Sequence, residues 1–258
     1  MTSGKWDATV SVVTGAIHLR QERCCQDYGL SLCEPENFAI ACVADGHGSN
    51  SCPYSDEGAT EAVNIAIEIL REMLPDLSAH KDIRLPKLIE TNWKERIRKI
   101  HEEKEREPSE PFPYIQYGTT LLGVAATNEF IFVLQIGDGN ILLIDNDGNA
   151  HPLLAVEENV GEDTESLCLD DAWTQIRTQI IPCDSSNGAA MILLATDGYS
   201  NSFANTGGFL KAGSDFFKLW REEGFSYIKE NLSDWLRASS DKGSGDDIAM
   251  ALITFEKT

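Results

Sequence analysis

Aspartate residues stand at the ends of several predicted strands, often beside glycine. The sites are Asp27, Asp45, Asp138, Asp197 and the adjacent pair Asp246 and Asp247. One aspartate beside a glycine at a strand end is ordinary turn chemistry. Five such sites in one core are harder to explain that way, because converging strand ends would bring several carboxylates into one pocket. Like charges that lie so close are costly unless cations neutralise them, so the pattern predicts a metal site.

The donor type restricts which metals and reactions fit these residues. Carboxylate oxygens select hard ions such as Mg²⁺, Mn²⁺ or Ca²⁺ rather than zinc. Two such ions about 3.5–4 Å apart can bridge a water, turn it into hydroxide near neutral pH and clamp phosphoryl oxygens. The aspartates alone therefore favour metal-assisted hydrolysis of a phosphate ester.

His47 follows Asp45 by two residues. A lone histidine is commonly structural, but at the mouth of a metal pocket it could instead protonate a departing alkoxide. The sequence contains no G-x-S-x-G, H-E-x-x-H or G-x-x-x-x-G-K-[ST] motif, which argues against other hydrolase and nucleotide-binding classes. Its seven cysteines form no C-x-x-C pair, so a zinc knuckle is not expected. The cysteines are expected to be reduced thiols.

Composition limits the partners and the compartment. The 258 residues include 21 Lys and Arg against 42 Asp and Glu, for a formal net charge of −21. Nucleic acid or an anionic membrane surface would need a basic footprint, so neither is expected as a partner. The N-terminus lacks the apolar core of a signal peptide and no 18-residue apolar run occurs, which predicts a cytoplasmic protein. With no Pro/Gly/Ser-rich linker, residues 1–258 are expected to form a single domain. The protein is expected to be a monomer.

The hydrophobic pattern indicates an α+β protein. Strand patterns fall on residues 8–17, Phe38–Ala44, 119–127, 130–136, 140–145, 150–155, 175–181, 189–196 and 248–255. Helical spacing begins near Ser55, recurs over about 86–105 and occurs twice within 213–239, and residues 156–171 resemble an acidic surface excursion. This order is not the regular alternation of a parallel sheet. It predicts antiparallel sheets with helices packed on their outer faces.

Six motifs in chain order resemble the metal-dependent PP2C-type (PPM family) protein serine/threonine phosphatases. They are QD at 26–27, VADGHG at 43–48, YGTTLL at 117–122, QIGDG at 135–139, LATDG at 194–198 and GDDI at 245–248. Each motif is weak alone, but six in register are specific, and they cover nearly the whole chain. The resemblance implies a four-layer sandwich of two antiparallel β-sheets flanked by α-helix pairs.

The resemblance also implies a set of metal ligands. Asp45 would bridge two Mn²⁺ or Mg²⁺ ions, and the Gly46 carbonyl would bind one of them. Asp197 and Asp246 would bind the other ion. Asp138 matches a position associated with a third, weaker metal.

Two further residues match positions with catalytic roles in the family. Asp27 would hold metal-bound waters, and His47 would be the general acid. The implied reaction is direct attack of a metal-bridging hydroxide on phosphoserine or phosphothreonine in a protein substrate. No phosphoenzyme would form.

The sequence departs from the family pattern at three places. Gln26 stands where Glu or Asn-Glu is usual before the first Asp, and Glu22 occupies the position of a phosphate-binding Arg, with Arg20 and Arg23 out of register. The family's Gly-Asp-Ser-Arg is Gly-Asp-Gly-Asn here, ending at Asn140. The metal core therefore matches the family, whereas the residues for phosphate anchoring and substrate choice differ.

These departures leave alternatives open. One is a pseudophosphatase that binds phosphoproteins or a regulatory partner without turnover. Another is hydrolysis of a small phosphorylated metabolite. Residues 150–175 match the family's variable flap loosely and are either a specificity element or a plain acidic loop.

Overall fold

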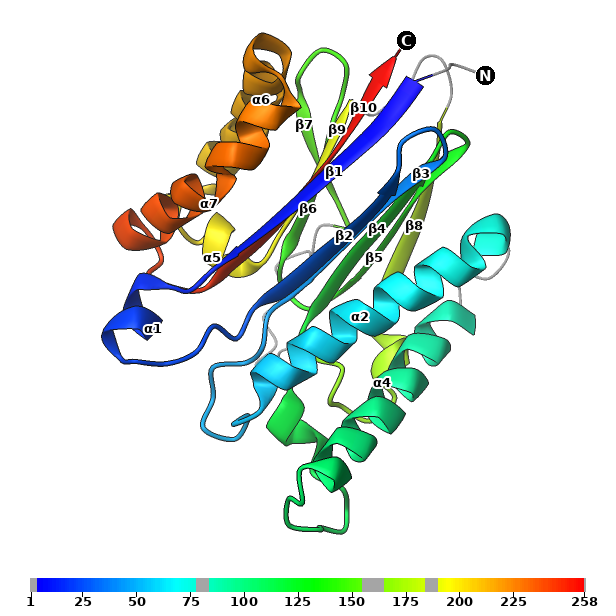
Figure 1. The fold of residues 1–258 in the computed structure, drawn as a ribbon, viewed down its shortest axis with the longest axis vertical. Helices are drawn as coiled ribbons and strands as arrows, with labels where there is room; N and C mark the ends of the chain where they lie inside the picture. The colour runs from blue at the N-terminus through cyan, green and yellow to red at the C-terminus, as the bar shows by residue number, and fades with distance from the viewer. Residues whose placement is uncertain (1–3, 78–83, 155–164, 184–189, 258) are drawn as a thin grey trace.

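The computed structural model describes residues 4–77, 84–154, 165–183 and 190–257 and contains two five-stranded sheets (Figure 1). One sheet has the order β1 (Gly4–Val13), β10 (Ile248–Lys257), β9 (Met191–Ala195), β6 (Asn140–Ile144) and β7 (Ala150–Leu153). The other has the order β2 (Tyr28–Glu34), β3 (Phe38–Ala44), β4 (Leu121–Thr127), β5 (Phe130–Ile136) and β8 (Arg177–Pro182). Neighbouring strands are antiparallel throughout these two orders.

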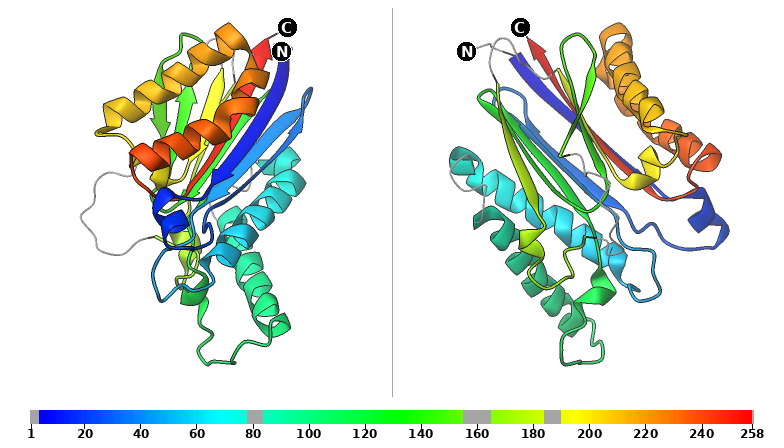
Figure 2. Two further views of the ribbon diagram at one scale, coloured as in Figure 1. Left: turned by 60° about the vertical axis from the view of Figure 1, so that its left-hand side comes forward. Right: turned by 180° about the vertical axis from the view of Figure 1, so that it is seen from behind.

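A pair of helices covers the outer face of each sheet, as the two turned views in Figure 2 show. The pairs are α2 (Ser55–Met73) with α4 (Arg84–Glu103), and α6 (Thr206–Glu223) with α7 (Phe225–Lys242). Shorter segments join these layers: α1 (Ala16–Arg20), η1 (Leu74–Asp76), η2 (Tyr114–Tyr117), η3 (Ala172–Thr174) and α5 (Asp197–Ser200). The predicted four-layer α+β sandwich is confirmed.

Three apolar clusters hold the four layers together, and β3 shows how. Every residue of β3 is buried. Because successive strand residues point to opposite faces, Ile40 and Cys42 pack under α2 and α4, whereas Ala41 and Val43 pack between the sheets. A third cluster lies between the other sheet and α6 and α7. The unbroken apolar run thus reflects a strand covered on both sides.

Some predicted boundaries were wrong. The strand expected over 8–17 ends at Val13, and Ala16 and Ile17 belong to α1. Strand β2 was not predicted, because Gly29 and Ser31 dilute a half-exposed edge strand. Helix α6 begins at Thr206 instead of 213. Residues 155 and 189, at predicted strand ends, lie outside the described residues, as does 156–164 of the predicted acidic excursion.

The cysteines and the helices show two further features. No disulfide joins the cysteines among the described residues, and Cys42 is fully buried. Within the described ranges, no helix combines the length and apolar character that crossing a membrane requires.

Arg106 links the loop after α4 to the start of α2. Its guanidinium donates to both carboxylate oxygens of Glu57 at 2.6 and 3.0 Å and stacks over the Tyr54 ring, 3.5 Å from the centroid. Burial opposes ionisation of Glu57, but hydrogen bonds from Arg106 and Lys104 prevail and lower its pKa. The pair fixes the end of α2 that faces the loop of residues 45–54.

Replacing Glu57 with Gln should therefore destabilise the fold in a pH-dependent way. Since the folded-state pKa of Glu57 lies below its ordinary value, its contribution is present above that value and is lost as pH falls through the folded-state pKa. We expect Glu57→Gln to lower the free energy of unfolding by about 1.5–3 kcal/mol at pH 7, with the difference from the parent shrinking below about pH 4. Urea unfolding at several pH values measures it. Glu103→Gln, which removes an exposed 3.8 Å pair with Lys99, should change stability by less than about 0.5 kcal/mol.

Candidate active site

A cavity of about 740 Å³ lies where strand ends from both sheets meet at one end of the sandwich. Of the seven residues predicted for the site, six line it: Asp45, Gly46, His47, Asp138, Asp197 and Asp246. Asp27 is not part of the lining and lies behind it, 6% exposed. The structure therefore brings four of the strand-end aspartates, Asp45, Asp138, Asp197 and Asp246, around one space, and the roles assigned to them stay a prediction.

The Gly118-Thr119-Thr120 segment holds Asp45 at the end of β3. The Asp45 amide donates to Thr120 Oγ1 at 3.0 Å, and the Asp45 carbonyl accepts from Thr120 N and Thr119 Oγ1, both at 2.9 Å. These bonds fix the backbone on both sides of the side chain. The two threonines of the YGTTLL motif thus hold the backbone of Asp45 in place.

Asp197 starts α5 directly after β9, and the Asn201 side chain donates to its Oδ2 at 2.9 Å. The next residue has to be glycine. A Cβ at Gly198 would lie 2.0 Å from the Asp247 carbonyl oxygen, a backbone atom that cannot move aside. The Thr-Asp-Gly sequence therefore lets α5 approach the start of β10 closely enough to bring Asp197 and Asp246 to one cavity.

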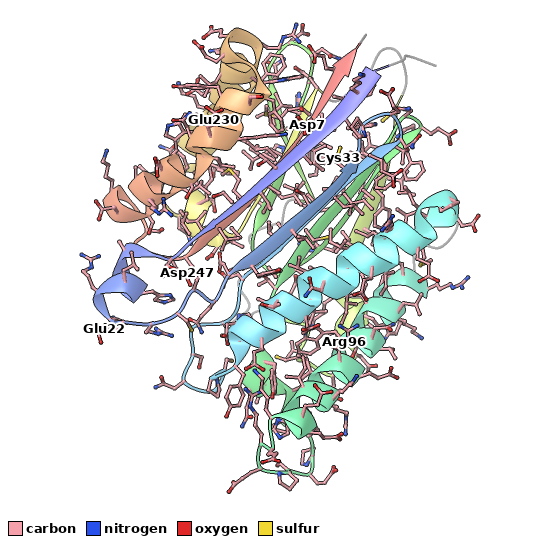
Figure 3. The ribbon with its side chains drawn as sticks, in the orientation of Figure 1. Asp7, Glu22, Cys33, Arg96, Glu230 and Asp247 are labelled. Carbon is pink, nitrogen blue, oxygen red and sulfur yellow. The ribbon has the colours of Figure 1, made fainter. Side chains whose placement is uncertain are left out.

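Asp247 has a structural role that the sequence analysis did not predict. It is 3% exposed and accepts from Gly15 N at 2.6 Å, Gln26 N at 2.7 Å and His18 Nδ1 at 2.9 Å. Figure 3 labels it where β10 begins, beside the segment that leads into α1. Asp247 anchors α1 and the approach to β2 at the cavity wall.

Asp27 joins the two sheets behind the cavity. It precedes β2, and its Oδ2 accepts from Thr196 Oγ1 at 2.6 Å and from Ala249 N at 3.0 Å in the other sheet. Burial, followed by the charges of Asp247 and Asp246, raises its pKa, although the Thr196 bond lowers it. Asp27 therefore connects β2 to β9 and β10 at the site.

The raised pKa values of two aspartates show that carboxylates lie close together at the cavity. Burial raises the pKa of Asp45, and the charges of Asp27 and Asp197 raise it further. Burial is also the main cause of the raised pKa of Asp197, with Asp138 and Asp246 adding to it. Cations would relieve this repulsion, because they favour the ionised carboxylates.

The donor chemistry of this cavity fits hard divalent cations. Its lining includes the carboxylates of Asp45, Asp138, Asp197 and Asp246 and the residue Gly46, and carboxylate and carbonyl oxygens are the donors that Mg²⁺ and Mn²⁺ prefer. In the part of the chain that the structure describes, no three His, Cys, Asp or Glu side chains form a ready-made metal site. Mg²⁺ usually keeps several waters and takes only one or two carboxylates, so a ligand set of few side chains suits it.

His47 faces the cavity from the loop after Asp45. Its amide donates to the Gly118 carbonyl at 3.0 Å, whereas its Nε2 is buried without a hydrogen-bond partner among the described residues. Burial lowers its pKa, and the nearby Asp138 opposes that shift. The His47 ring is thus held at the cavity, and its Nε2 keeps its hydrogen-bonding capacity unused among the described residues.

Asp138 sits on a turn that is tied to the segment after residue 164. Gly137 has φ +97°, a conformation that favours glycine, and its carbonyl accepts from Arg177 at 2.9 Å. Arg177 also binds Glu165 at 2.9 Å. The turn and its aspartate are therefore positioned by β8.

Residues 165–171 correct the prediction of a plain acidic surface loop. Leu167 is fully buried, and Ser166, Cys168 and Leu169 line the cavity. Ser166 Oγ accepts from Thr119 N at 3.1 Å. This part of the segment is a wall of the site.

Comparison with known proteins agrees with this geometry. A sequence profile of the family described as "Protein phosphatase 2C" matches residues 14–237. The chain belongs to the protein phosphatase 2C family. No curated protein sequence matches it.

Solved structures share the protein phosphatase 2C fold at low sequence identity. The catalytic domain of the serine/threonine phosphatase PstP, solved with two manganese ions, has a TM-score of 0.63 and 14% identity, covering 99% of this chain and 100% of that one. RsbX with magnesium gives a TM-score of 0.55 and 14% identity, covering 99% and 100%. A C. elegans sex-determining protein gives 0.61 and 14%, and the match covers 96% of this chain but 64% of that protein.

Two departures from the usual protein phosphatase 2C sequence have visible consequences. Gln26 takes part in the cavity wall, where its Nε2 donates to Ser55 Oγ at 2.6 Å and to the His47 carbonyl at 3.3 Å. Glu22 is exposed with φ +54°, and Figure 3 shows it at the outer end of α1. Arg23 is also exposed, but its Nη2 donates to Gln26 Oε1 at 3.1 Å and to the Gly48 carbonyl at 3.3 Å.

The close approach at Gly198 gives a test of how this protein phosphatase 2C site is assembled. Gly198→Ala should lower the free energy of unfolding by about 2–3 kcal/mol, because the added methyl group overlaps the Asp247 backbone. Urea unfolding measures the change. Gly207→Ala, in the exposed first turn of α6, is the matched control and should not lower stability, because alanine is favoured over glycine in a helix by up to about 1 kcal/mol. Equal effects of the two substitutions would contradict the packing argument.

Proposed function

We propose that this chain is a Mn²⁺- or Mg²⁺-dependent protein phosphatase that hydrolyses phosphoserine and phosphothreonine. The observation that supports this most is the convergence of Asp45, Asp197 and Asp246 on one cavity from three strand ends. In this proposal residues 1–258 are one catalytic domain, monomeric and cytoplasmic, and the substrate is a phosphorylated protein segment. The net charge of −21 disfavours nucleic acid and anionic membranes as partners.

Asp45, the Gly46 carbonyl, Asp197 and Asp246 would hold two ions, and Asp138 a third, weaker one. Divalent cations held there would lower the pKa of a shared water, so that hydroxide attacks phosphorus directly, and would neutralise phosphoryl charge. Asp27 would order waters from behind the cavity while it keeps the two sheets in register through Thr196. The chain itself thus supplies fixed carboxylates and a shaped polar cavity.

His47 would donate the proton that a serine or threonine alkoxide needs in order to leave. Its Nε2 is buried at the cavity and has no hydrogen-bond partner among the described residues. Burial lowers the pKa of His47 in the substrate-free protein, but a phosphate dianion beside the ring favours its protonated form. Substrate binding would therefore place a proton on His47 where the leaving oxygen develops charge.

Asp197→Asn tests the proposed metal ligands. With a phosphothreonine peptide and Mn²⁺ or Mg²⁺, we expect turnover that EDTA abolishes and that Asp197→Asn reduces by about 10³-fold or more, since a neutral amide is a poor ligand for a hard cation. Thermal unfolding should show that the variant is folded, because an amide oxygen can still accept from Asn201. Asp215→Asn removes an exposed carboxylate paired with Lys211 on α6 and should keep the parent rate.

The same assay separates the alternatives. Undiminished metal-dependent turnover in Asp197→Asn would contradict the assigned ligands. A folded protein without turnover in either metal would instead favour a pseudophosphatase that binds phosphoproteins. Faster hydrolysis of small phosphorylated metabolites than of phosphopeptides would move the proposal to that substrate class.

His47→Ala should show whether the histidine is a proton donor. For a phosphothreonine peptide, whose alkoxide must be protonated, we expect kcat to fall by about 10²–10³-fold. For p-nitrophenyl phosphate, whose leaving group departs without a proton, the loss should stay below about tenfold. His151→Ala on β7, where the ring is exposed, is the control and should affect neither substrate. Equal losses on both substrates would assign His47 a structural role instead.

A further inference from the structure

A second, smaller hollow opens beside the cavity, and Asp138 belongs to the lining of both. This side pocket has a volume of about 300 Å³ and lies between the start of β6, strand β7 and the first turns of α6. Its walls are mainly apolar and include Leu142 from β6, Leu153 from β7, and Phe209 and Leu210 from α6. Because Asp138 lines both hollows, a peptide whose phosphate occupies the cavity passes close to the side pocket.

Gln135 brings an unused hydrogen-bond acceptor to this lining. The residue is 1% exposed, and its Nε2 donates to the Gly137 carbonyl at 3.1 Å and to the Gly139 carbonyl at 2.6 Å. These two bonds fix the orientation of the amide, because a flipped amide would set its oxygen against two carbonyl oxygens. The remaining atom, Oε1, is buried and has no hydrogen-bond partner among the described residues. Leaving such an acceptor unpaired is costly, so a ligand that carries a donor would stabilise it.

Asn140 adds a second acceptor of this kind. It begins β6 and lines the side pocket, and its Oδ1 is likewise buried with no partner in the described ranges. The family pattern has arginine at this position, as the last residue of Gly-Asp-Ser-Arg. Among the described residues the lining contains no Lys, Arg or His, whereas Asp138 contributes a carboxylate at the boundary with the cavity. The side pocket therefore presents acceptors and negative charge but no cation of its own.

A side chain that fits this lining has an apolar stem and several N–H donors at its end. Arginine and lysine have this form, because their methylene stems pack on apolar walls while the charged end binds oxygen atoms. Arginine fits better, since its guanidinium is more weakly hydrated than an ammonium group and its planar set of five donors can serve two acceptors at once. The net charge of −21 also favours a basic segment over an acidic one.

We propose that the side pocket binds an arginine side chain of the substrate, located within about three residues of the phosphoserine or phosphothreonine. The guanidinium donates to Gln135 Oε1 and Asn140 Oδ1, and the stem packs on Leu153 and Leu210. Asp138 stays available to the metal proposed for it, because the guanidinium uses the two amide oxygens. Three extended residues span about 10 Å, which is comparable with the width of a cavity of about 740 Å³. This inference rests on the proposed phosphatase function and names the substrate class for that site.

Phosphothreonine peptides test the side pocket when a single arginine is placed in turn at each position from three before to three after the phosphothreonine. Glutamine at the same position is the reference for a neutral donor, and norleucine is the reference for an apolar stem alone. At one position we expect arginine to raise kcat/KM by about tenfold over both references, as charge-assisted hydrogen bonds to two acceptors would.

Asn140→Leu removes the acceptor but keeps a side chain of similar size, and it should reduce the preference for arginine to about twofold or less. Urea unfolding should show the variant to be at least as stable as the parent, because the change removes a buried oxygen that has no partner among the described residues. Leu210→Trp, which fills the side pocket from α6, should reduce the preference in the same way. Asn231→Leu on α7 lies outside both linings and is the matched control, which should keep the preference of the parent.

Binding of peptides with a non-hydrolysable phosphonate in place of the phosphate, followed by fluorescence anisotropy, separates failure of the side pocket from failure of the proposed function. Arginine-dependent binding that Asn140→Leu removes supports the side pocket even if turnover is absent. Normal turnover with equal use of the arginine, glutamine and norleucine peptides would overturn it. A preference for arginine that both Asn140→Leu and Leu210→Trp leave intact would also overturn it, because the arginine would then bind elsewhere.

Discussion

Repulsion among buried carboxylates is the constraint that the rest of the structure has to satisfy. Asp27, Asp45 and Asp197 all have raised pKa values, first from burial and then from one another or from Asp138 and the pair at 246–247. An arrangement of this kind opposes folding unless other interactions hold it. Strands with apolar packing on both faces, such as β3, supply that stability close to the site. A strained charge cluster rests on a rigid scaffold, which is a common arrangement at functional sites.

Hydrogen bonds to two of these aspartates also make the site rigid. Asp27 connects β2 to the other sheet through Thr196 and Ala249, and Asp247 connects β10 to α1 and Gln26. The joined residues are 169 to 232 positions apart in the chain. Carboxylates within one cluster thus have different tasks, since Asp45 and Asp197 face the cavity while Asp27 and Asp247 secure its walls. Secure walls matter because catalytic groups must be held to fractions of an ångström.

Much of the fold and of the site was predictable from the sequence, for physical reasons that can be named. The run at 38–44 and the helical spacing from Ala59 to Leu70 reflect burial, which dictates residue type directly, and the structure confirms both. The strand-end aspartates were predictable because one core brings strand ends together. Strand β2 was missed because an edge strand needs less apolar character. The resemblance gave a role to Asp246 alone, and the hydrogen-bonding role of Asp247 was missed, since adjacent residues of one type carry no signal of which side chain turns inward.

The position of β10 has a consequence for how the protein is made. This strand lies between β1 and β9 in its sheet and begins directly after Asp246 and Asp247. During synthesis β10 leaves the ribosome after every other element of the site. Until then β1 lacks the strand it pairs with, and the carboxylate cluster lacks Asp246 and Asp247. Pairing of such distant strands is a late step in folding, because the intervening chain must first be closed into a loop. A nascent chain can therefore bury much of its apolar core before the aspartate cluster is complete. The cluster forms only when β10 has been added to its sheet.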